Sequence, residues 1–152
     1  MSLWNYKLKI PGFNSKYKKT IVSVNSDLQG TSINLPKPFG KNKDIKINIS
    51  IDAFLENNKL HDINIIYNGI YAEISSLEKS SGYINFSGKK LKAPNNRFNL
   101  FGNLSVLNLS DWSDLKTDKD STDYLSYINK INIKIDKLIS SNIILDLSLI
   151  HI

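Results

Sequence analysis

Strict alternation of apolar and polar residues is the feature that most constrains what this chain can fold into. From Ile45 to Asp52, isoleucines occupy every odd position, and Lys46, Asn48, Ser50 and Asp52 occupy the even ones. A period of two places these two sets on opposite faces of a β-strand. The pattern therefore predicts a half-buried strand with one apolar face and one face in water.

The same alternation recurs along most of the sequence. It predicts further strands over residues 3–10, 20–25, 60–68, 70–74, 84–88, 98–106, 131–135 and 143–149. Asn68-Gly69 predicts a type I′ hairpin, because both residue types tolerate positive φ. Short strands at regular spacing indicate an all-β, mostly antiparallel domain. A closed sandwich, a barrel and an open curved sheet all satisfy this pattern.

The segments between the expected strands have their own signals. Pro36 and Pro38 lack N–H donors, so residues 35–38 should form an extended rim outside the sheet. Residues 53–58 are expected to be a short connection. The apolar phase slips near Val106 and Leu107, which predicts a β-bulge. Residues 112–123 are acidic and have no period, so we expect a loop there, followed by a short helix over 121–128.

Composition excludes several classes of function. The 152 residues suit one domain, and the net charge is +6, yet Arg97 is the only arginine. Nucleic-acid recognition favours arginine, so we expect no nucleic-acid partner and a lysine-rich, solvated outer face. The sequence has no cysteine, and no apolar run reaches the ~18 residues of a membrane span. The first residues lack the apolar stretch of a signal peptide, so we expect none there.

No group of residues predicts catalysis. His61 and His151 are far apart, and the acidic residues of 111–123 lack the spacing of a calcium loop. No nucleophile elbow or phosphate-binding glycine loop is present. We therefore expect no enzymatic activity, no metal and no cofactor. The aromatic residues follow the strand phase, so we expect them in ordinary packing.

The apolar strand faces remain, and they have two interpretations. They form either the closed core between two sheets or the open concave face of one curved sheet. An open face would be an unusually large apolar surface that needs a ligand. Lipid acyl chains would suit it, because each methylene moved out of water contributes ~0.8 kcal/mol. Periodicity alone leaves both interpretations open.

Two stretches resemble one family of proteins. Residues 26–41 read SDLQGTSINLPKPFGK and resemble the "SDL-G-x-x-LP-x-P-x-x-K" stretch of the YhdP family, which are large AsmA-like envelope proteins of Gram-negative bacteria. Residues 98–112 read FNLFGNLSVLNLSDW and resemble the later "G-x-L-x-x-L-x-L-x-x-W" segment of the same family. The two stretches occur in the family's order.

The resemblance implies a fold, a function and a location. Residues 1–152 would be one β-groove segment of a longer periplasmic protein, which an anchor outside this segment tethers to the inner membrane. It would move phospholipid between the inner and outer membranes, with no catalytic residue, through contacts with acyl chains and with neighbouring β-groove segments of the same chain. The alternative is a structural, adhesin-like β-domain with a closed core.

In the groove interpretation, apolar residues in strand phase would line the lipid path. We expect the lining to be Ile45, Ile47, Ile49, Ile51, Ile63, Ile65, Ile70, Ile74, Ile84, Phe86, Phe98, Leu100, Leu104, Val106, Ile131, Ile133, Ile135, Leu145 and Leu147.

Overall fold

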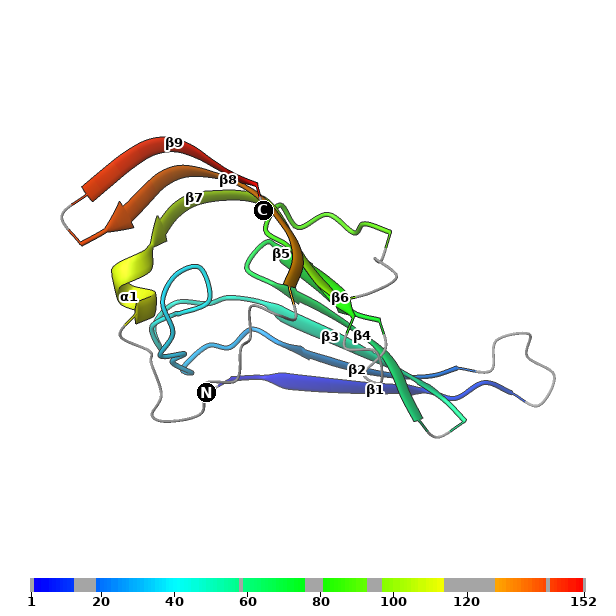
Figure 1. The fold of residues 1–152 in the computed structure, drawn as a ribbon. Helices are drawn as coiled ribbons and strands as arrows, with labels where there is room; N and C mark the ends of the chain where they lie inside the picture. Colours follow the sequence, from blue (N-terminus) through cyan, green and yellow to red (C-terminus); the bar gives the residue numbers. More distant parts are fainter. Residues whose placement is uncertain are drawn as a thin grey trace.

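The computed structural model describes residues 2–12, 19–57, 59–75, 81–92, 97–113, 128–141 and 143–151, and for 147–151 it describes the backbone alone. These residues form one nine-stranded sheet in which strand order follows sequence order (Figure 1). The elements are β1 (Trp4–Lys9), β2 (Thr20–Ser26), β3 (Ile49–Glu56), β4 (Lys59–Tyr67), β5 (Ile70–Ile74), β6 (Gly82–Asn85), β7 (Phe98–Asn108), α1 (Leu109–Ser113), β8 (Ile128–Ser140) and β9 (Ile143–His151).

The sheet is open and mostly antiparallel. All neighbouring strands pair antiparallel except β6 with β7 and β7 with β8, which pair parallel. The end strands β1 and β9 do not pair with each other, so the described strands do not close into a barrel. The open curved sheet is therefore the arrangement that this chain adopts among those its sequence allows.

The sheet curves strongly along its length. Figure 1 shows β7, β8 and β9 arching away from the flatter layer of β1 to β4, with β5 and β6 at the bend. The segment that connects β2 to β3 projects into this curve, and α1 lies beside it. The concave side of the sheet is thus partly filled at one end.

The strand predicted from residue 45 begins later than its alternation indicates. β3 starts at Ile49 and continues to Glu56, so most of the predicted connection at 53–58 is strand. The reason lies in the backbone hydrogen bonds of the residues before it. The N–H of Ile45 donates to the carbonyl of Asn42 at 3.2 Å, and the N–H of Ile47 donates to that of Asp27 at 3.1 Å. These bonds belong to a loop, so residues 45–48 do not extend the strand.

The turn prediction is confirmed, and the rim prediction is confirmed in its position outside the sheet but not in its extended backbone. Asn68 and Gly69 have φ angles of 47° and 73°, as a type I′ turn requires, and they connect β4 to β5. Pro36 and Pro38 lie outside every described strand, but residues 37–39 form a turn rather than an extended segment, in which the N–H of Phe39 donates to the carbonyl of Pro36 at 3.0 Å. Local turn chemistry therefore decided these connections.

The helix is not where the sequence analysis expects it. α1 begins at Leu109, and Asn108 caps it by accepting a 3.1 Å hydrogen bond from the N–H of Ser110. The expected helix at 121–128 falls on residues outside those described, except Ile128, which begins β8. The Asn-Leu-Ser sequence at 108–110 was the missed cap signal.

The phase slip in β7 is real, but no bulge accompanies it. Leu107 packs against the buried cluster of Leu104 and Ile135, whereas Val106 is 39% exposed. The pairs Leu104–Ile135, Val106–Lys137 and Leu107–Leu138 keep one continuous register. The predicted bulge near Val106 and Leu107 is therefore wrong: the register shift between β7 and β8 lies at Phe98 and Asn99 instead.

This cluster should be the most sensitive packing site under β7 and β8. We expect Ile135→Ala to lower the free energy of unfolding by about 2–4 kcal/mol, because Ile135 is fully buried and its truncation leaves a cavity. Val106→Ala, a matched truncation on the neighbouring strand, should cost less than about 1 kcal/mol. Urea denaturation of both variants measures this difference. Equal losses would contradict the assignment of Ile135 to the core.

Candidate functional site

Strand register gathers the apolar residues of eight strands on one face. Two rows cross the sheet, each with one residue from every strand from β1 to β8. We call them the apolar rows. The first contains Tyr6, Val24, Ile51, Ile65, Ala72, Ile84, Leu100 and Ile131. The second contains Leu8, Val22, Ala53, Ile63, Ile74, Gly82, Phe98 and Ile128.

The residues between them in each strand point the other way and are mostly polar. We call this side the polar face. One of its rows contains Lys7, Ser23, Asp52, Asn64, Glu73, Tyr83, Asn99 and Lys130. The sheet is therefore amphipathic across its whole width, as period two and continuous pairing require.

Exposure of the apolar face changes from one end of the sheet to the other. At the β1 edge, Tyr6 is 72% exposed and Leu8 is 60% exposed. In β2 to β6 the row residues are half-buried, and under β7 and β8 Leu104, Ile133 and Ile135 form a buried cluster. The face is thus open toward β1 and well packed toward β8.

Most residues expected to line a lipid path lie on this face. Those in the apolar rows are Ile51, Ile63, Ile65, Ile74, Ile84, Phe98, Leu100 and Ile131. Ile49 and Ile70 share strand phase with them, and Phe86, Leu104, Ile133 and Ile135 belong to the cluster or pack against it. Val22 and Val24 also lie in the rows; their own alternation was a signal that the predicted lining left out.

The other expected residues are placed differently. Ile45 is 48% exposed and, like Ile47, precedes β3. Val106 is exposed, and Leu107 takes its place in the packing because of the phase slip. Leu145 pairs with Leu138 at the β9 edge and is half-exposed. The side chain of Leu147 lies outside the described part of the chain.

Residues 27–48, which we call the rim loop, cover one end of the apolar face. Phe39 lies 6.2 Å from Phe86 and 5.9 Å from Trp112 between ring centroids, the latter edge-on. The hydroxyl of Tyr67, which is on β4, donates to the carbonyl of Phe39 at 2.6 Å. The rim loop therefore bridges β4, the end of β6 and α1 across the concave side.

A buried lysine holds the rim loop together. Lys41 is 5% exposed, and its ammonium donates to the carbonyls of Leu28 at 2.8 Å, Asn42 at 3.0 Å and Thr31. Gly40 is also required, because a Cβ there would lie 1.7 Å from the carbonyl oxygen of Leu35. Several residues of the 26–41 motif thus serve the internal architecture of this loop.

The polar face carries a second buried cluster. Tyr71 and Tyr83 stack with ring centroids 5.8 Å apart, and the Tyr71 hydroxyl donates to the Glu73 carboxylate at 3.2 Å. The Tyr83 hydroxyl donates to the carbonyl of Leu91 at 2.9 Å and accepts from its N–H at 2.8 Å. Burial, and next the charge of Glu73, raise the pKa of Tyr71 well above its usual value.

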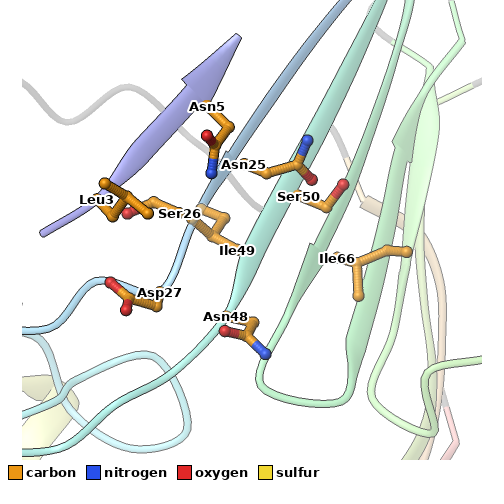
Figure 2. Close-up of a pocket in the computed structure, with 9 residues that line it drawn as sticks. All are labelled: Leu3, Asn5, Asn25, Ser26, Asp27, Asn48, Ile49, Ser50 and Ile66. Carbon is orange, nitrogen blue, oxygen red and sulfur yellow. The ribbon is translucent and has the colours of Figure 1, made fainter. Parts of the chain in front are cut away.

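Three hollows that the sequence analysis did not anticipate also lie mainly on the polar face. Figure 2 shows the first, of about 370 Å³, where Asn5, Asn25 and Ser50 lie side by side on β1, β2 and β3. The second, of about 450 Å³, lies over β6, β7 and β8. The third, of about 220 Å³, contains Asp62 and Glu73. Sequence reasoning missed them because each collects residues from several strands.

The described residues contain neither a metal-ligand cluster nor a membrane-spanning helix. His61 lies on the surface, with Nδ1 2.9 Å from the Asp62 carboxylate, and the described residues hold no group of three metal-ligating side chains. None of the helical structure described is long and apolar enough to cross a bilayer.

Comparison with known proteins gives this chain no relative: no family model, no curated protein and no solved structure matches it. The family resemblance of residues 26–41 and 98–112 therefore stays an expectation from the sequence.

Lys41 generates a prediction about stability. Lys41→Met keeps the side-chain length but removes the charged hydrogen bonds that the ammonium makes to three carbonyls, so we expect a loss of about 2–4 kcal/mol in the free energy of unfolding. Lys43→Met, at an exposed position of the same loop, should change it by less than about 0.5 kcal/mol. Chemical denaturation of both variants measures the effect. A Lys41→Met protein as stable as the Lys43→Met protein would contradict the conclusion that Lys41 holds the rim loop together.

Tyr71 generates a prediction about pH. The fold holds the neutral phenol, and the folded pKa is raised above the unfolded value near 10, so its contribution to stability is complete below about pH 10 and falls as the pH rises further. We expect Tyr71→Phe to reduce this alkaline fall in the unfolding free energy. Urea denaturation between about pH 8 and pH 11 measures it. If the unfolding free energies of wild type and Tyr71→Phe changed in parallel with pH, the raised pKa of Tyr71 would be contradicted.

Proposed function

We propose that the apolar face binds phospholipid acyl chains and that this chain is a segment of a lipid-transfer path. The observation that carries the proposal is the pair of apolar rows, which runs unbroken across β1 to β8 on the concave side of an open sheet. Monomeric soluble proteins rarely expose a contiguous apolar surface of this extent.

The energetics favour a long, flexible hydrocarbon as the ligand. The rows cross seven strand spacings of about 4.8 Å, so they extend over roughly 30 Å. Each buried methylene contributes ~0.8 kcal/mol before the cost of ordering the chain. Aliphatic side chains present no fixed polar partner, so a bound acyl chain can slide without breaking directional bonds.

The exposure gradient supports an entrance near β1. Tyr6 and Leu8 are open to solvent there, while the cluster under β7 and β8 and the rim loop fill the other end. Phospholipid would enter along the exposed part of the rows. Transfer between the inner and outer membranes, a periplasmic location with tethering to the inner membrane, and neighbouring β-groove segments as partners enter this proposal from the family resemblance alone.

The test places a charge on either face of the same strand. Ile65 lies in an apolar row, and Ile66 points to the polar face, where it is 51% exposed. We expect delipidated wild-type protein to bind a fluorescent phospholipid, Ile65→Asp to lose about tenfold or more in affinity, and Ile66→Asp to bind as wild type does. Fluorescence titration measures affinity, and circular dichroism checks that each variant is folded.

The outcomes separate the two functional classes. A wild-type protein that takes up no phospholipid, and carries none by native mass spectrometry after purification, would refute lipid binding and favour the structural, adhesin-like alternative. Equal losses in Ile65→Asp and Ile66→Asp would show that binding does not use the apolar rows.

A further inference from the structure

The second hollow of the polar face differs from the other two in its charge. Its volume is about 450 Å³, and it lies over the segment after β6 and the central parts of β7 and β8. Its lining contains two lysines and no carboxylate. The residues are Asn85, Ser87, Lys89, Leu91, Phe101, Gly102, Asn103, Asn132 and Lys134.

Its two lysines have no acidic partner among the described residues. Neither Lys89 nor Lys134 takes part in any of the ion pairs there. The third hollow is balanced instead: Lys19 lies 3.4 Å from Asp62, and Lys90 lies 3.9 Å from Glu73. The second hollow therefore concentrates uncompensated positive charge.

Neutral hydrogen-bonding groups and an apolar wall complete the lining. The side chains of Asn103 and Asn132 are exposed and make no hydrogen bond within the described chain, so their amides are available to a ligand. Phe101 and Leu91 supply apolar surface beside them. Such a combination suits an anion carried on a small organic body.

The hollow is held in shape before any ligand binds. The Asn85 amide donates to the carbonyl of Lys89 at 2.9 Å, and its side-chain oxygen accepts from the N–H of Ser87 at 2.9 Å. The paired hydrogen bonds between Tyr83 and Leu91 fix the next part of the same segment. This wall of the hollow therefore needs little further ordering when a ligand binds.

We propose that this hollow binds a phosphate monoester. Two ammonium groups match the charge of a phosphate near neutral pH, lysine is an established phosphate ligand, and the amides can donate to the remaining oxygens. The site lies on the face opposite the apolar rows, so it does not depend on acyl-chain binding. The phosphate could belong to a soluble sugar phosphate or to the headgroup of phosphatidic acid.

The experiment uses the whole chain and separates these sources. Glucose 6-phosphate is titrated into isotopically labelled protein and followed by amide NMR, with glucose as the uncharged control. Vesicles of phosphatidylcholine with and without phosphatidic acid test the headgroup. We expect saturable shifts in residues 85–91, 101–103 and 132–134 with the phosphate, and about tenfold weaker binding in Lys134→Gln and in Lys89→Gln.

The matched control is Lys130→Gln, because Lys130 is an exposed residue of the polar face on the same strand but outside the hollow. It should bind as wild type does. Binding to glucose 6-phosphate or selective binding to phosphatidic acid vesicles supports the site and identifies the source. Three results would overturn the proposal: no binding to either phosphate, equal binding of glucose, or an equal loss in Lys130→Gln.

Discussion

Everything in this structure depends on the register between neighbouring strands, which shifts locally at Phe54–Leu55 between β3 and β4 and at Phe98–Asn99 between β7 and β8. A shift of one residue in any pair would carry the apolar side chains of that strand to the opposite face. Because both apolar rows continue from β1 to β8, small half-buried contacts add up to one continuous apolar surface. The change from antiparallel to parallel pairing at β6–β7 leaves this surface intact, since paired residues share a face in both arrangements.

An open sheet needs some means of ending its apolar face, and the rim loop supplies it here. Phe39 reaches across to Phe86 and Trp112, while the buried ammonium of Lys41 joins carbonyls from separate parts of the loop. Removing a buried charged donor from several acceptors is strongly destabilising, so Lys41 is a principal stabilising contact of this loop. The face is consequently graded, from filled under β7 and β8 to exposed at β1.

The two faces of the sheet have separate chemistry. One offers aliphatic surface and no directional partner, which suits a hydrocarbon ligand. The other carries the stacked Tyr71 and Tyr83 with Glu73, and a lysine-lined hollow beside them. Because backbone pairing alone joins the two faces, a substitution on one face leaves the side chains of the other in place, and the two proposed sites can be tested independently.

The sequence by itself determined the all-β class, the amphipathic faces, the turn at Asn68-Gly69 and the rim position of Pro36 and Pro38, because period two and turn chemistry are local properties. It could not place the start of β3, since the backbone groups of Ile45 and Ile47 are taken by the rim loop. Only the tertiary structure decided that the sheet stays open, that β6, β7 and β8 run parallel, and that lysines and amides from three segments surround one hollow. Those features arise from contacts between residues far apart in the chain, which no local period encodes.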